Sequence, residues 1–191
     1  MKSLRFMLPV ALLLPCAAGF AQEHAMPKPA ALKSDAQTTF DTMKNLAGDW
    51  MTAQITVDPP QPQWDTNKGA HITLRVTSRG NALVHEMQEE GTPLDATKYD
   101  HPITMFYVDG EQLTLVHYCD AGNRPRMRGK ISADGKKVEF DFADVSGSTQ
   151  YGHMHHAVFT FIDADHHTED WTYMMPGDKP VRAHLDLHRA K

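Results

Sequence analysis

Histidine and cysteine side chains recur in two pairs whose members are two residues apart. His117 and Cys119 form one pair, and His153 and His155 form the other. Residues at this spacing on a β-strand point to the same face. Imidazole nitrogens and a thiolate are good ligands for zinc or copper. If the two pairs face each other, these four residues complete a metal site or hold a haem.

The residues after the second pair predict where it points. On a strand, Ala157, Phe159 and Phe161 share the face of His153 and His155, and all three are apolar. This pattern predicts that both histidines point inward at the mouth of a barrel. The alternative is a rim of solvated or hydrogen-bonded histidines.

A polar loop follows the first pair. Asn123, Arg124 and Arg126 offer many hydrogen-bond donors, and arginine forks suit a carboxylate or a phosphate group. In the alternative interpretation, the arginines pair with acidic side chains and close one end of the barrel. The acidic candidates for that pairing are Asp120, Asp144 and Glu169.

Two glutamates, Glu86 and Glu169, fall on predicted strands rather than in loops. An inward carboxylate in an apolar cavity has a raised pKa and can bind a ligand or work with a histidine as a general acid or base. This arrangement would make the protein a small hydrolase or isomerase. Outward, solvated glutamates on alternating strands are the other interpretation.

Composition narrows the function classes. The chain has 191 residues, 12 histidines and a formal net charge of -5, and the acidic balance argues against nucleic-acid binding. The sequence has no glycine-rich phosphate loop, no G-x-S-x-G, no H-E-x-x-H and no C-x-x-C motif. An enzyme is therefore not the leading interpretation, and no cofactor is required.

Alternation of apolar and polar residues, with a period of two, dominates the chain after residue 48 and predicts strands. Tight turns such as Asp109-Gly110 and Asp134-Gly135 separate the runs. The expected strands are 50–57, 72–77, 82–88, 105–108, 112–118, 126–132, 137–142, 154–163, 168–174 and 181–188. A short helix from residue 34 or 35 to 45 precedes them. The pattern predicts an all-β, antiparallel up-and-down barrel of about 8–10 strands, with a two-sheet sandwich as the alternative.

The N-terminal residues resemble a secretory signal. Lys2 and Arg5 precede a short apolar stretch, and Gly19 and Ala21 stand at the small positions before a cleavage site. We expect a signal peptide at residues 1–21, a flexible leader at 22–35, and the barrel at 36–191. The mature protein would be periplasmic or extracellular, without a membrane span. A lipoprotein anchored at Cys16 is the less favoured alternative, since a proline precedes that cysteine.

Three segments carry a resemblance to a family. Residues 40–50, which end in Gly48-Asp49-Trp50, resemble the opening of lipocalin-like (calycin) barrels. Residues 117–127 and 152–155 are similar to segments of uncharacterised, DUF1579-like secreted bacterial proteins of that type. The resemblance implies a barrel with a small-molecule cavity. It also implies that Trp50 packs across the closed end beneath a basic residue of the last strand, Arg189 or Arg182.

These observations favour a secreted barrel that binds a small apolar or amphipathic molecule. The metal or haem site and the hydrolase or isomerase remain as alternatives. The residues expected to contact the ligand are His117, Asn123, Arg124, Arg126, His153, His155 and Glu169. The expected structural residues are Gly48, Trp50 and Arg189.

Overall fold

The computed structural model of the chain describes residues 33–62 and 66–191. The predicted signal peptide and most of the predicted leader lie outside these residues. Helix α1 (Asp35–Met43) is followed by the 3₁₀ turn η1 (Lys44–Leu46). The helix begins at Ser34, whose side chain accepts a hydrogen bond of 3.1 Å from the Gln37 amide. The predicted short N-terminal helix is confirmed.

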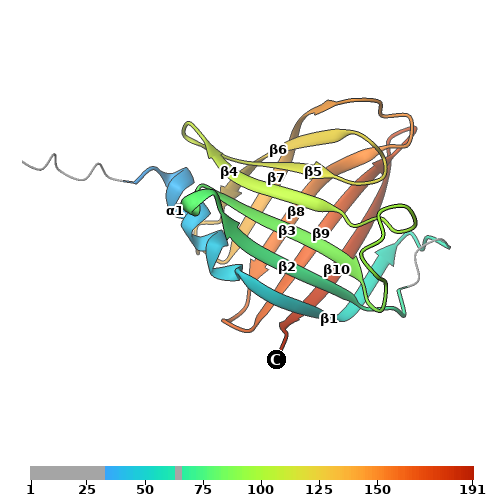
Figure 1. Cartoon of the computed structure of the whole chain (residues 1–191). Coiled ribbons are helices and arrows are strands. Elements are labelled where there is room, and N and C mark those ends of the chain that lie inside the picture. The colour runs from blue at the N-terminus through green and yellow to red at the C-terminus, as the bar shows by residue number, and fades with distance from the viewer. Residues whose placement is uncertain (1–32, 63–65) are drawn as a thin grey trace, which may run out of the picture. The chain divides into compact units, whose positions relative to one another are not determined.

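Ten antiparallel strands close into a barrel in the order β1-β10-β9-β8-β7-β6-β5-β4-β3-β2 (Figure 1). They are β1 (Gly48–Asp58), β2 (Ala70–Thr77), β3 (Ala82–Glu89), β4 (Ile103–Asp109), β5 (Gln112–Tyr118), β6 (Arg124–Ile131), β7 (Lys137–Ser146), β8 (His153–Phe161), β9 (His166–Met175) and β10 (Lys179–Arg189). A second 3₁₀ turn, η2 (Ser78–Gly80), joins β2 to β3. Because β1 pairs with both β2 and β10, the sheet has no free edge. The predicted barrel is confirmed, and the two-sheet sandwich is excluded.

One end of the barrel is covered by α1, drawn in blue in Figure 1. Phe40, Met43 and Leu46 are buried there in the same core cluster as Trp50. The Trp50 indole donates a hydrogen bond of 2.8 Å to the Leu46 carbonyl. The helix therefore acts as a plug that extends the barrel core.

Arg189, at the end of β10, lies over the plug. Its guanidinium carbon is 4.2 Å from the centroid of the Trp50 ring, a cation–π contact. Gly48 permits this approach, since a Cβ there would lie 2.4 Å from Nη1 of Arg189. Of the two arginines that the sequence offers for this position, Arg189 occupies it, whereas Arg182 lines a groove elsewhere.

Aromatic rings fill the barrel on the plug side. Phe106, Phe140 and Phe159 are completely buried. Their ring centroids lie 5.4 to 6.0 Å apart in tilted and edge-to-face arrangements. The aromatic core thus occupies the half of the barrel next to the plug.

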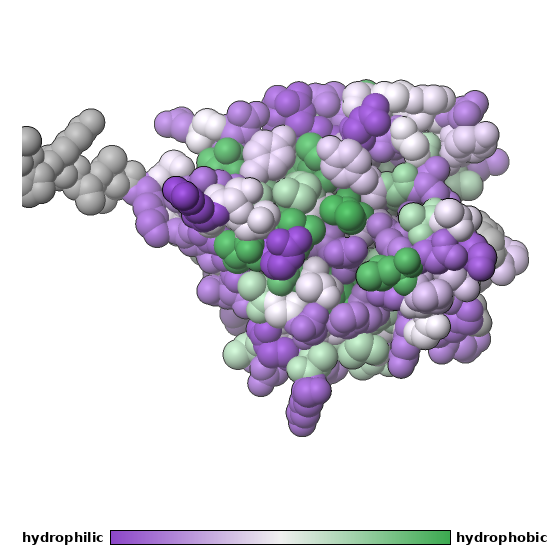
Figure 2. All heavy atoms as spheres, viewed as in Figure 1, coloured by the Kyte–Doolittle hydropathy of each residue, from purple (hydrophilic) through white to green (hydrophobic). Residues whose placement is uncertain are grey.

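The face of the molecule shown in Figure 2 is mainly hydrophilic, with hydrophobic residues in small groups. Single exposed apolar side chains such as Leu94 and Tyr151 are normal for a protein surface. Among the described residues, no helix is long and apolar enough to cross a membrane.

Candidate functional site

A cavity of about 720 Å³ occupies the barrel at the end opposite the plug. Because β1 starts at the plug, the β1–β2, β3–β4, β5–β6 and β7–β8 connections all lie at this opposite end, and each contributes to the cavity rim. The wall is mainly apolar; its apolar side chains are Ile55, Val57, Met87, Met154, Trp171, Met175, Val181, Ala183 and Leu185. A cavity of this size suits one small molecule.

A buried carboxylate lies below the cavity, between the ligand space and the aromatic core. Glu169 on β9 is completely buried and contacts three nitrogen atoms. His85 Nε2 lies 3.0 Å and the Trp171 indole nitrogen 2.9 Å from Oε2, and His167 Nε2 lies 3.1 Å from Oε1. All three are hydrogen-bond donors when the carboxylate is ionised.

These contacts explain the ionisation of Glu169. Burial alone would raise the pKa of its carboxyl group. The neighbouring His85 and the hydrogen bond from His167 outweigh burial and hold the pKa below its usual value. The expectation of a raised pKa for an inward glutamate is therefore wrong for Glu169. That expectation holds for a carboxylate in apolar surroundings, whereas three hydrogen-bond donors surround this one.

The two histidines that contact Glu169 differ in their surroundings. The Nδ1 atom of His167 is buried without a hydrogen-bond partner among the described residues. His85 lines the cavity as well as contacting Glu169, so it connects the buried carboxylate to the cavity.

His117 is the second imidazole of the cavity floor. Its Nδ1 lies 2.8 Å from the hydroxyl of Thr104, and its ring centroid is 5.8 Å from that of Trp171. Burial and the neighbouring His85 lower the pKa of His117 to about 4, so the ring is neutral near pH 7. The Nε2 atom has no hydrogen-bond partner within the described part of the chain. The floor thus offers a fixed, neutral imidazole to a ligand.

The rim is acidic. Asp100 and Asp120 both line the cavity, and the Asp120 amide donates a hydrogen bond of 3.2 Å to the Asp100 carboxylate. Partial burial and the charge of Asp120 raise the pKa of Asp100 to about 6. Burial also raises the pKa of Cys119, another rim residue. Cys119 is therefore a neutral thiol at pH 7 and a poor nucleophile.

The second histidine pair does not join His117 and Cys119. Met154 of β8 pairs with Tyr173 of β9, but His156 pairs with Thr172, so His155 is an extra residue in a β-bulge. The bulge reverses the alternation, and Met154 rather than His153 or His155 lines the cavity. The prediction that both histidines point inward is wrong for this reason. The proposed four-residue metal site is not assembled, because His155 lines a different pocket.

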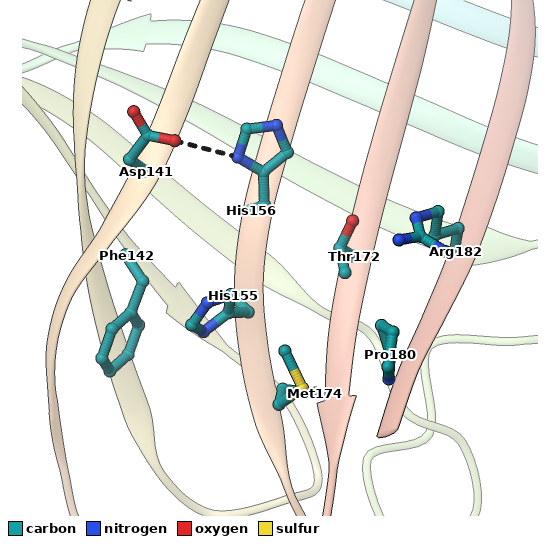
Figure 3. Close-up of a pocket in the computed structure, with 8 residues that line it drawn as sticks. All are labelled: Asp141, Phe142, His155, His156, Thr172, Met174, Pro180 and Arg182. Carbon is teal, nitrogen blue, oxygen red and sulfur yellow. Dashed lines mark ion pairs between the residues drawn. The ribbon is translucent and has the colours of Figure 1, made fainter. Parts of the chain in front are cut away.

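That pocket is a groove of about 590 Å³ on the outer wall (Figure 3). The ladder between β7 and β8 ends at Asp141 and His156, which form an ion pair of 3.2 Å. Beyond this point the ring of Phe142 lies 4.9 Å from that of His155 and 4.7 Å from that of His153. The two histidines therefore pack where two strands part, not in the cavity.

The polar loop also faces away from the cavity. Asn123 is buried, and its amide nitrogen donates to the carbonyls of Ser148 and Gly152 at 2.9 and 2.7 Å. Arg126 forms an ion pair with Asp144, and Arg124 donates to the Ser146 hydroxyl at 3.2 Å. The arginine contacts link β6 and β7, and the Asn123 contacts join the β5–β6 connection to the β7–β8 connection. They match the alternative interpretation in which an arginine pairs with Asp144, and none of the three residues lines the cavity.

The site contains one residue, His85, that the motifs and spacings in the sequence do not indicate. Its only signal is that it shares a strand face with Leu83 and Met87, both apolar. His85 and Leu83 are buried, whereas the neighbouring Glu86 is more exposed. A polar residue on the apolar face of a predicted strand was therefore the better indication of a site residue than the carboxylate beside it.

The fold and cavity define a closed ten-stranded antiparallel barrel with space for one small molecule. The crystal structure of Rv2717c from M. tuberculosis matches it with a TM-score of 0.56 at 15% identity, over 80% of this chain and 98% of that one. A protein of unknown function from the DUF3598 family of Nostoc punctiforme matches with a TM-score of 0.48 at 9% identity, over 78% of this chain and 49% of that one. No protein-family model and no curated protein matches the sequence. At this identity, the likeness to Rv2717c concerns the fold alone.

Proposed function

We propose that the barrel binds a small amphipathic molecule in its interior cavity. The observation that carries this proposal is a cavity of about 720 Å³ whose wall is mainly apolar and whose floor presents two imidazoles, His85 and His117. Apolar walls supply affinity, and a few fixed polar groups supply orientation. The resemblance to secreted lipocalin-like barrels supports the same function.

The charge distribution favours one orientation of the ligand. Asp100 and Asp120 line the rim and would repel an anionic head group there. Glu89 also lines the cavity, but it is paired with Lys68, another lining residue, at 2.6 Å. The floor offers Nε2 of His117, which has no hydrogen-bond partner among the described residues, and the ring of His85 beside it. A ligand with a carboxylate or another hydrogen-bonding head group therefore enters head first, with its chain against the methionines Met87, Met154 and Met175.

A dansyl-labelled undecanoic acid tests this proposal. We expect its fluorescence to rise and shift to the blue on binding, with one site per chain. His117→Leu should weaken binding by about tenfold, since a hydrogen bond to a buried group contributes about 1.5 kcal/mol. His156→Leu, on the outer wall, is the matched control and should leave the dissociation constant unchanged. Absence of saturable binding to the unmodified protein, or equal loss in both variants, would contradict the proposal.

A haem is the second candidate ligand, and one observation favours it. His117 is neutral, held by Thr104 through Nδ1, and its Nε2 has no partner among the described residues. An axial histidine ligand has this arrangement. Titration with hemin should then shift the Soret band with one haem per chain, and His117→Leu should abolish the shift. A shift that persists in this variant would exclude His117 as the axial ligand.

We also propose that the protein is exported, with residues 1–21 removed as a signal peptide. The basic residues, apolar stretch and small residues of this segment support the proposal. The mass of the protein purified from the periplasm or medium of a bacterial host should correspond to a chain that starts at Gln22. A full-length chain retained in the cytoplasm would contradict it.

A further inference from the structure

Three side chains on the outer wall of β9 and β10 converge on one point. His188 on β10 lies directly opposite His166 on β9 in the antiparallel ladder. Asp186 is two residues before His188 and so shares its face of the strand. The two imidazole rings stack, with centroids 4.2 Å apart and an angle of 17° between their planes. The wall thus presents two parallel imidazoles beside one carboxylate.

The donor atoms are already close together. His166 Nε2 lies 2.7 Å and His188 Nε2 lies 3.7 Å from Oδ1 of Asp186, and the three ligand atoms lie within 4.8 Å of one another. A zinc ion bound at about 2.0–2.2 Å from each ligand needs donor atoms about 3.3 Å apart. Small side-chain rotations therefore suffice to place one ion between all three.

No lysine or arginine in the described part of the chain forms an ion pair with Asp186. Among the described residues, its ion-pair partners are the two histidines alone. A comparable group on β7 and β8, formed by Glu139, Asp141 and His156, also has ligand atoms within 4.8 Å of one another. There, however, the Lys130 ammonium lies 2.9 Å from Asp141 and 3.5 Å from Glu139. That second group already contains a cation, whereas the group around Asp186 does not.

We propose that His166, Asp186 and His188 form a binding site for one divalent transition-metal ion on the outer wall of the barrel. Two imidazole nitrogens and one carboxylate oxygen suit zinc or copper(II) and disfavour calcium and magnesium, which require more oxygen ligands. The three protein ligands leave at least one coordination position for water. The long β9–β10 ladder holds the ligands in register. Because none of the three residues lines the cavity, this site is independent of ligand binding inside the barrel.

Zinc titration of untagged protein by calorimetry, with metal content measured after dialysis, tests the proposal. We expect one zinc ion per chain, and we expect His166→Gln, His188→Gln and Asp186→Asn each to weaken binding by about tenfold or more. Cobalt(II) should occupy the same site, and its visible absorption bands should report nitrogen ligation that the double variant H166Q/H188Q loses. Circular dichroism checks that each variant remains folded.

Two matched controls separate this site from other surface histidines. His184 lies on the same strand and is bonded to Asp170 at 2.6 Å, so His184→Gln should retain full zinc binding. His156→Gln, in the group that contains Lys130, should also retain it. Binding that persists in H166Q/H188Q, or that His184→Gln or His156→Gln removes, would overturn the assignment, as would the absence of stoichiometric zinc in the unmodified protein.

Discussion

At the scale of single residues, Glu169 connects the core to the cavity. Its carboxylate is fully buried and contacts His85, His167 and Trp171. These partners extend in two directions: His167 packs against Trp50 in the core, whereas His85 and Trp171 line the cavity. The position of the His85 imidazole at the cavity floor therefore depends on a carboxylate that does not itself line the cavity.

Replacement of this carboxylate should be costly. Glu169→Gln keeps the shape, removes the negative charge that His85, His167 and Trp171 surround, and turns an amide N–H₂ toward groups that are themselves donors. We expect the free energy of unfolding to fall by about 3–5 kcal/mol, as for other broken buried ion pairs. Urea denaturation measures this value. Glu111→Gln, in an exposed turn, is the control and should change stability by less than about 0.5 kcal/mol. A similar small effect for both variants would show that Glu169 is not ionised.

His117 should make the protein sensitive to mild acid. Its pKa is about 4 in the folded protein, against an ordinary value of 6.5, so the unfolded chain binds more protons between these two pH values. Stability from this group is complete above pH 6.5 and is lost as the pH falls toward 4, by up to about 3 kcal/mol. His117→Leu should flatten the dependence of the unfolding free energy on pH in this window. Unchanged curvature in the variant would refute the assignment.

At the scale of secondary-structure elements, strands were predictable and bulges were not. All ten strands follow from alternation and turn residues, because half-buried strands repeat with a period of two. The extra residue His155 obeys no such pattern, since a bulge is fixed by how β8 pairs with β9. Because of this one extra residue, Met154 lines the cavity and His153 and His155 do not. His117 was predictable because β5 has no such shift before it.

Arg189 joins three elements at the closed end. It donates to the carbonyls of Ala47 and Ala164 at 3.0 Å each and stacks on Trp50. A lysine cannot reproduce this planar set of donors. We therefore expect Arg189→Lys to lower the midpoint of urea denaturation, with a loss of about 1–3 kcal/mol. The same change at Arg182, which lines the outer groove, is the control. An equal loss of stability at the two positions would indicate that the hydrogen bonds of the Arg189 guanidinium do not stabilise the fold.

At the scale of the whole molecule, the barrel is filled in one half and hollow in the other. The plug helix, Trp50 and three phenylalanines fill one end, and the cavity lies at the other. Because closely packed side chains stabilise a core, we expect the aromatic half to contribute most of the folding free energy. Stability and binding should then respond separately to substitutions in the two halves.

Ala183→Trp tests this separation. Ala183 lines the cavity on β10, opposite Trp171 in the ladder, and a tryptophan there would project into space that a ligand needs. We expect loss of binding of the dansyl fatty acid with a change in stability of less than about 1.5 kcal/mol, since added atoms enter a cavity and not a packed core. Val158→Trp adds a large ring to the outer wall, where Val158 alternates with the buried Ala157 and Phe159, and should leave binding intact. An unchanged dissociation constant in Ala183→Trp would contradict a binding site against this wall of the cavity.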